Sequence, residues 1–276
     1  MLTVVALLAF AGNSILCRLA LRDHAIDPWS FTAIRLASGA ILLLPLVWPR
    51  TKGNTPIEQR LAGSRWAAAA LLVYALGFSL AYVSLDAGTG ALLLFGTVQI
   101  TMIAAGIRNG ERPTAVAAFG MLLAISGVVW LVLPGVQAPD PFGALLMTIA
   151  GVAWGVYSLL GRGATEPSRA TARNFALAAP IAVIAMATAS TRTSMSADGI
   201  WLAIASGVVT SAIGYVIWYM ALPRHSATSA AVVQLLVPVL AAVGGVTLLG
   251  EPTSMRLLAA SALTLGGVAT TVLSRK

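Results

Sequence analysis

The chain has 276 residues, of which 58% are apolar and only 9% are charged, and its net charge is +8 at pH 7. Soluble domains average about 45–50% apolar and about 25% charged residues, so this composition excludes a water-soluble globular protein and predicts an integral membrane protein. The basic residues lie in short loops between apolar runs, which indicates orientation in a bilayer rather than a nucleic-acid partner.

Ten apolar runs follow one another along the chain, each long enough for a membrane-spanning helix of about 20 residues. They cover residues 2–20, 29–48, 66–85, 90–107, 114–133, 142–161, 171–190, 200–221, 228–249 and 254–273. The first run has neither a basic segment before it nor a small-residue cleavage site, so we expect a retained span rather than a signal peptide. The predicted fold class is an all-α integral membrane protein with ten transmembrane helices.

Lys and Arg are unevenly divided between the two sides of this predicted bundle. With the amino terminus placed inside, twelve of them fall in cytoplasmic loops and the carboxyl tail, whereas Arg22, Arg192 and Arg256 fall outside. Because basic residues of short loops stay on the cytoplasmic side, both termini are predicted to be cytoplasmic. We expect a multi-pass protein of the plasma membrane, which in a bacterium is the inner membrane.

A short motif recurs at matching places in the two halves of the chain. NGERPT at 109–114 follows the fourth predicted span, and LGEPTS at 249–254 follows the ninth. The flanking spans also match in order and spacing. For the recurring acids, Glu111 and Glu251, we expect a structural role at the start of the next helix, where the helix dipole favours a negative charge.

The ten spans therefore divide into two five-helix repeats, 1–135 and 141–276. Because each repeat has an odd number of spans, the two copies must have opposite orientations in the membrane. Inverted repeats are typical of alternating-access transporters, whose binding site lies near the midplane between the halves.

Several stretches resemble a known family when they are read in order. They are the second span with Arg35, AYVSLDAGTGALL at 81–93, WGVYSLLGR at 154–162, WYMALPRHSATSAAVV at 218–233 and VPVLAAVGGVTLLGEPTS at 237–254. Together they resemble the drug/metabolite transporter superfamily and its EamA-type ten-helix carriers, and the chain is similar to YddG-like aromatic amino-acid exporters. The resemblance covers almost the whole chain and implies export of amino acids or other small metabolites.

Polar and aromatic side chains inside the predicted spans are the candidates for a substrate site, because such groups usually face the bundle interior or a wet cavity. The set is Asn13, Tyr74, Phe78, Tyr82, Gln99, Trp154, Tyr157, Tyr215 and Gln234. Two alternatives stay open. Aromatic residues near span ends form interfacial belts in many membrane proteins, and Asn or Gln side chains often bond one helix to another.

Two arginines, Arg18 and Arg35, also lie inside predicted spans. Snorkelling of the charged group to the interface is the simpler account of both. In the alternative account, Arg35 is a gate element or a clamp for a substrate carboxylate.

None of the nine acidic residues lies in the interior of a predicted span. A proton-coupled carrier normally keeps an ionisable relay in the membrane, so facilitated export or exchange is favoured over coupling through a membrane carboxylate. The single cysteine, Cys17, offers neither a disulfide framework nor a metal cluster. We predict no catalytic residues, no metal and no cofactor.

The predicted function is secondary transport: export of small amphipathic metabolites, most of all amino acids with aromatic or apolar side chains, through a central cavity. A nucleotide-sugar carrier would need several fixed cations, and only Arg18 and Arg35 are available inside the spans. The expected partners are the small-molecule substrate and the lipid bilayer, with no nucleic acid, and we expect a monomer rather than an obligate oligomer. An integral-membrane enzyme and a channel-like pore remain the alternatives.

Overall fold

The structure is a computed structural model that describes residues 1–47, 65–110, 112–135, 137–161, 166–189, 194–221 and 233–274. In these ranges the regular structure is helical, apart from an isolated bridge between Ile26 and Met195. An all-helical chain satisfies its backbone hydrogen bonds within each segment, as the bilayer interior requires.

Five helices form the first half of the chain. They are α1 (Leu2–Arg22), α2 (Pro28–Val47), α4 (Arg65–Ala81), α5 (Ala87–Arg108) and α6 (Ala115–Val132). The second half contains α7 (Pro141–Gly161), α8 (Pro167–Ala189), α12 (Leu236–Leu249) and α13 (Met255–Leu273). Between α8 and α12 lies one long rod made of α9 (Ala197–Ala205), the π-helix η1 (Ser206–Ile213) and α10 (Gly214–Ala221).

Eight of these helical segments are long and apolar enough to cross a membrane. Two further apolar helices, α4 with 17 residues and α12 with 14, are shorter. The described helices match the ten expected spans in order, so the chain is a multi-pass, all-helical membrane protein.

Two expected boundaries, the end of the third span and the start of the fourth, are wrong, and the expected start of the ninth span at residue 228 lies outside the described residues. We predicted spans over 66–85 and 90–107, but α4 ends at Ala81 and α5 begins at Ala87. The intervening residues form a turn held by backbone bonds such as that from the Leu85 amide to the Ala81 carbonyl, at 3.0 Å. Asp86 then has extended backbone before α5. Apolar composition continues through Leu85, and for this reason hydropathy placed the break between the two spans at 86–89, after the end of α4 rather than at it.

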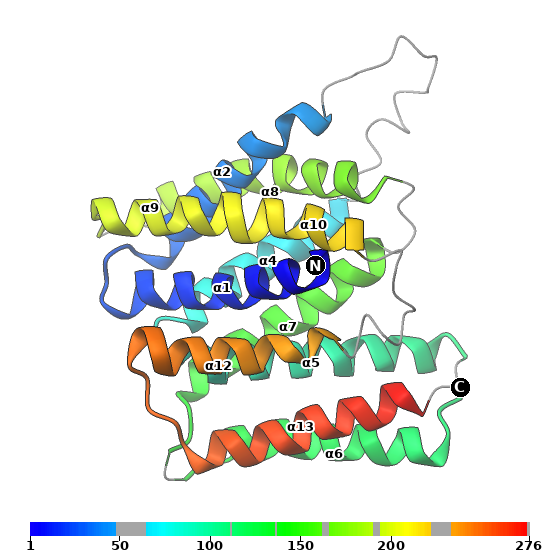
Figure 1. Ribbon diagram of the computed structural model, residues 1–276. Helices are drawn as coiled ribbons and strands as arrows, with labels where there is room; N and C mark the ends of the chain where they lie inside the picture. Colours follow the sequence, from blue (N-terminus) through cyan, green and yellow to red (C-terminus); the bar gives the residue numbers. More distant parts are fainter. Residues whose placement is uncertain are drawn as a thin grey trace, which may run out of the picture.

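Each half packs against the other through helices that hold the same place in their halves. α2 packs on α8, α5 on α12 and α6 on α13. Two further contacts exchange places between the halves. The third helix of the first half, α4, packs on the first of the second half, α7, and α1 packs on the rod of α9, η1 and α10. Figure 1 shows α6 and α13 side by side at the lower edge of the bundle, and α1 running between α12 and the rod.

Small residues allow the close approach of α6 and α13. A Cβ added to Gly120 or Gly127 would overlap atoms of α13, and one added to Gly267 would overlap the backbone of α6. Close backbone contact of this kind drives helix association in membranes, where burial of apolar surface gives little.

The π-helix η1 interrupts the rod where it faces α1 and α2. Ser206, Thr210 and Ser211 on η1 are all buried. Gly207 brings η1 against α2, because an added Cβ there would overlap the Arg35 carbonyl. π-helical segments are rare in proteins, and those that occur often lie at functional sites. The contacts of η1 are therefore candidates for a functional role.

Candidate functional site

A small cavity lies at the centre of the bundle, between the first and second halves. Its volume of about 20 Å³ is room for about one water molecule. The residues that line it are Phe10, Asn13, Ser14, Tyr74, Phe78, Leu94, Phe95, Trp154, Thr210 and Tyr215. They come from α1, α4, α5, α7, η1 and α10, so five spans converge here. A molecule as large as an amino acid requires these helices to move apart.

Aromatic rings form most of the cavity wall. The ring of Trp154 lies 4.6 Å from that of Tyr74 and 5.0 Å from that of Tyr215. Phe78 packs on Tyr74 at 5.3 Å, and Phe10 meets Tyr215 edge-on at 5.9 Å. The tilted and edge-on geometries are those that aromatic quadrupoles favour. The cavity therefore offers ring faces from both halves.

Asn13 ties α1 to η1 beside this aromatic wall. Its Oδ1 accepts hydrogen bonds from Ser206 Oγ at 2.7 Å and from Thr210 Oγ1 at 3.1 Å. Its Nδ2 donates to the Tyr74 hydroxyl at 3.4 Å. A buried amide with these partners is satisfied, so Asn13 both lines the cavity and holds the two halves together.

Arg35 lies directly behind the cavity wall. The residue is 1% exposed, and its Nε donates to Ser211 Oγ at 3.0 Å while Nη2 donates to the Tyr74 hydroxyl at 3.1 Å. The guanidinium carbon is 5.3 Å from the ring centre of Tyr74 and 5.1 Å from that of Phe78. Nη1 has no hydrogen-bond partner among the described residues. The snorkelling account of Arg35 is therefore wrong, because the charge points into the bundle.

Five of the nine candidate site residues line the cavity: Asn13, Tyr74, Phe78, Trp154 and Tyr215. The other four do not, although three of them are buried.

Tyr82 donates to the Ala87 carbonyl at 3.3 Å and packs on Phe78 away from the cavity. Tyr157 stacks behind Trp154 at 5.2 Å. Gln99 is buried in α5 but does not line the cavity, and Gln234 is half-buried just before α12. Tyr82 does not share the cavity-facing side of α4, because α4 ends at Ala81 and Tyr82 lies in the turn that follows.

Sequence reasoning left Phe10, Ser14, Leu94, Phe95 and Thr210 out of the candidate set. One signal was present, because Phe10, Asn13 and Ser14 share a face of α1 by their i, i+3 and i+4 spacing. Leu94 and Phe95 carry no polar group that would mark them among the many apolar residues of α5.

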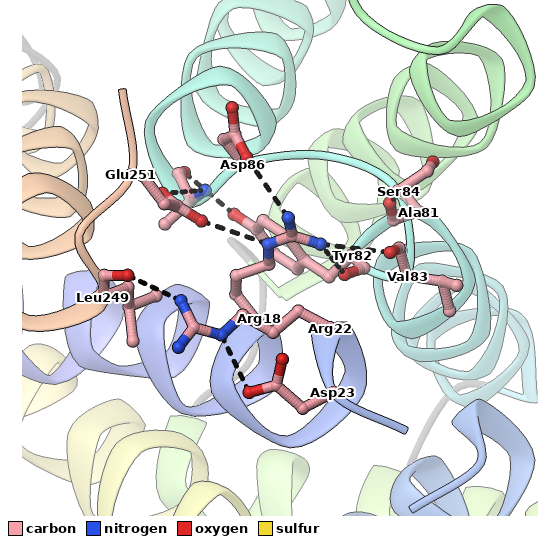
Figure 2. A network of polar contacts seen from close by, with 11 residues as sticks. Arg18, Arg22, Asp23, Ala81, Tyr82, Val83, Ser84, Asp86, Leu249 and Glu251 are labelled. Carbon is pink, nitrogen blue, oxygen red and sulfur yellow. Dashed lines mark hydrogen bonds and ion pairs between the residues drawn. The ribbon is translucent and has the colours of Figure 1, made fainter. Parts of the chain in front are cut away.

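A second polar cluster, the Arg18 network, closes the end of the bundle where α1, α4 and α12 end. Arg18 Nε donates to Glu251 Oε1 at 3.0 Å and Nη2 donates to Asp86 Oδ1 at 3.2 Å. Nη1 donates to the carbonyls of Tyr82 and Val83, at 3.1 and 3.0 Å (Figure 2). The Arg18 guanidinium thus reaches the end of its span, where protein groups from both halves hold it.

Glu251 has a different role from the one expected. It does not stabilise the start of α13, the helix that follows it, because the side chain of Ser254 caps that helix. Instead Glu251 Oε2 accepts from the amide of Ala87, the first residue of α5, at 2.9 Å. Burial raises the pKa of the Glu251 carboxyl, and nearby Asp86 adds to the rise, while the Ala87 amide and Arg18 act in the opposite direction. Glu111, its counterpart in the first half, lies outside the described residues.

Further contacts join the halves at the same end. Arg22 donates to the Leu249 carbonyl at 2.6 Å. The amide of Asp27 donates to the Ser194 carbonyl at 2.9 Å, and the amide of Ser196 donates to the Ala25 carbonyl at 2.8 Å. This end of the bundle is thus closed by bonds between segments far apart in the chain.

In the part of the chain that the structure describes, no group of three or more His, Cys, Asp or Glu side chains is arranged to hold a metal ion. The cavity wall contains no acid among its described residues either. What the site offers chemically is ring faces, hydroxyl and amide groups, and the charge of Arg35.

Comparison with known proteins gives full-length relatives. The chain is 51% identical over 269 residues to an uncharacterized protein of Pseudomonas aeruginosa, covering 98% of this chain and 92% of that protein. It is 28% identical over 261 residues to the threonine/homoserine exporter RhtA of Escherichia coli, covering 89% of this chain and 82% of RhtA. A probable terminal-alkyne amino-acid exporter of Streptantibioticus cattleyicolor is 27% identical over 281 residues, with coverage of 96% and 90%.

The fold has a solved counterpart as well. A crystal structure that is 20% identical in sequence superposes with a TM-score of 0.68 and covers all of this chain and 98% of the other. The EamA-like transporter family matches this chain over residues 1–133 and again over 141–273. Since the two matches together take in every helix of a multi-pass bundle, the chain belongs to the EamA-like transporter family, within the drug/metabolite transporter superfamily.

Proposed function

We propose that this protein exports small amphipathic metabolites, most of all amino acids with aromatic or apolar side chains, through the central cavity. The observation that carries the proposal is a cavity of aromatic and hydrogen-bonding groups between the two halves. Ring faces suit an apolar side chain, and the hydroxyl and amide groups suit the polar end of the same molecule. The names of two relatives, a threonine/homoserine exporter and a probable amino-acid exporter, support amino acids as the substrates.

The second part of the proposal is that residues 1–135 and 141–276 are inverted repeats that work by alternating access. The family matches twice, at 1–133 and 141–273, which supports a duplication. The packing of α2 on α8, α5 on α12 and α6 on α13 is what a twofold relation between the halves requires. Substrate sites of such transporters lie where the repeats meet.

With both termini in the cytoplasm of a bacterial cell, the Arg18 network faces the outside. The arrangement described here is then closed toward the exterior by Arg18, Glu251 and Asp86. Export requires this network to open, so that the cavity reaches the outer side. Facilitated or exchange-type transport fits a cavity without an acid among the described residues that line it.

Counterflow in liposomes that contain the purified protein tests this function. The expected result is saturable exchange of labelled amino acids. Unsaturable flux indicates the channel-like alternative, and a chemically altered substrate indicates an enzyme. Exchange of nucleotides without exchange of amino acids contradicts the proposed substrate.

Trp154→Ala is the variant that tests the cavity itself. Loss of the ring contacts to substrate lowers exchange about tenfold or more, since aromatic contacts and buried apolar area together exceed the energy of a factor of ten. Trp201→Ala is the matched control, because Trp201 is 68% exposed at the start of the α9 rod. Normal exchange by Trp154→Ala together with loss of exchange by Trp201→Ala rules the central cavity out.

A further inference from the structure

Arg35 is a buried cation for which the described residues supply no anion. The described ion pairs involve Arg18, Arg22 and Arg169. The bonds of Arg35 go to two neutral hydroxyls, those of Ser211 and Tyr74, and its Nη1 has no described hydrogen-bond partner. The surroundings of Arg18 are the opposite, with two carboxylates on one guanidinium.

A charge buried without a counter-charge is costly, and inside a membrane protein such a residue is functional by default. The rings of Tyr74 and Phe78 offset part of this cost through their contact with the guanidinium. They do not neutralise the charge. Because both rings also line the cavity, the cavity lies within the field of an unneutralised cation and favours a negative group over a positive one.

Tyr74 carries this preference to the cavity surface. Its hydroxyl oxygen accepts from Arg35 Nη2 and from Asn13 Nδ2. An oxygen that accepts two hydrogen bonds, one of them from a cation, becomes a stronger donor through its own hydrogen. Tyr215, from the second half of the chain, belongs to the same cavity wall, where its ring lies 5.0 Å from that of Trp154. Two hydroxyls, one from each half of the chain, thus lie next to the guanidinium: those of Tyr74 and Ser211.

We propose that this corner of the cavity binds a carboxylate of the transported molecule, with the hydroxyl of Tyr74 as its donor and Arg35 as the group that selects for negative charge. The proposal rests on the proposed function and narrows its substrate class. Carboxylic acids and zwitterionic amino acids are accepted, whereas amines and amides that lack the carboxylate are discriminated against. Arg35 is a specificity-determining residue that acts through Tyr74.

The test compares L-phenylalanine with L-phenylalaninamide, which is almost the same size but lacks the negative charge. Each unlabelled compound competes against labelled L-phenylalanine in the counterflow assay. For the wild-type protein we expect the acid to compete about tenfold better than the amide. The amide lacks one charge interaction with the protein, and the site is poorly solvated. In Arg35→Gln this preference falls to about twofold or less, whereas Arg169→Gln, the same change at an exposed ion pair, keeps it.

Tyr74→Phe gives an independent reading if Arg35→Gln does not fold. This variant removes only the hydroxyl and keeps the ring, so we expect weaker competition by the acid and unchanged competition by the amide. Equal competition by acid and amide in the wild type overturns the carboxylate proposal and leaves transport intact. If neither compound nor any other amino acid exchanges, the proposed function itself fails, and the inference fails with it.

Discussion

At the level of single residues, Arg18 and Arg35 show how differently the same side chain is used inside one bundle. Arg18 faces two carboxylates, those of Glu251 and Asp86, at 3.0 and 3.2 Å. Arg35 faces hydroxyls and rings alone among the described residues. Removal of the two charges therefore has opposite consequences for stability.

Arg35→Met is expected to stabilise the protein in the absence of substrate. The change removes an unneutralised buried charge and leaves a flexible apolar side chain of similar length, so the melting temperature rises by about 2–4 °C, which corresponds to about 1 kcal/mol. Transport of carboxylate substrates falls in the same variant, since sites built for function are often costly to stability. Thermal unfolding in detergent measures the first effect and counterflow the second.

Arg18→Met is the matched comparison and is expected to lower the melting temperature. Its removal leaves the carboxylates of Glu251 and Asp86 without their cation, and breaking one partner of a buried pair is strongly destabilising. A stability gain for Arg18→Met with a loss for Arg35→Met is the result that refutes this account.

At the level of elements, the Arg18 network joins α1, the α4–α5 turn and the segment between α12 and α13. The chain positions of Arg18 and Glu251 are 233 residues apart. Glu251 sits at the amino end of α5, where the Ala87 amide and the helix dipole favour a negative charge. The same carboxyl is buried, however, and its pKa is raised as a result.

The raised pKa predicts how stability depends on pH. Because the pKa of Glu251 is higher in the folded protein than in the unfolded chain, the folded state holds a proton that the unfolded chain has already released. The contribution of Glu251 is therefore fully present below the ordinary carboxyl range and is lost as the pH rises through the raised pKa. The charged groups that face Glu251 in this network are Arg18 and Asp86.

Melting temperatures measured across this pH range check the prediction. In the wild type, the melting temperature falls as the pH rises from the ordinary carboxyl range through the raised pKa of Glu251. In Glu251→Gln this fall in melting temperature disappears, because the amide does not titrate. Glu166→Gln, at an exposed pair with Arg169, keeps the wild-type slope. An identical slope in the wild type and in Glu251→Gln excludes Glu251 as the titrating group.

At the level of the whole molecule, the distribution of Lys and Arg predicts that the Arg18 network lies outside the cell. Two exposed prolines flank α6 at its opposite ends, Pro113 before the helix and Pro134 after it. In a background with Cys17→Ala, a membrane-impermeant maleimide added to intact cells is expected to label Pro134→Cys and to miss Pro113→Cys. The reverse pattern inverts the orientation and assigns the Arg18 network to the cytoplasmic side.

Much of the fold followed from the sequence because it depends on local properties. Membrane class, helix order and most helix boundaries are set by the length and composition of apolar runs. The α4–α5 turn was expected a few residues too late, at 86–89, because the residues that form it, from Tyr82 to Leu85, are mostly as apolar as the helices beside them. The recurrence of Gly-Glu near 110 and 250 pointed to the two halves that the family matches separately.

By itself, then, the sequence determined that this protein is an all-helical, multi-pass membrane protein of a transporter family and which aromatic and polar residues lie inside its expected spans. Only the tertiary structure decided which of them meet. Tyr74, Trp154 and Tyr215 converge on one cavity, while Tyr157 and Gln99 do not.

Glu251, expected to support its own helix, instead joins Arg18 and the start of α5. The reason is physical. A helix pattern specifies a face, but the rotation and depth at which that face meets its neighbours depend on packing between segments far apart in the chain.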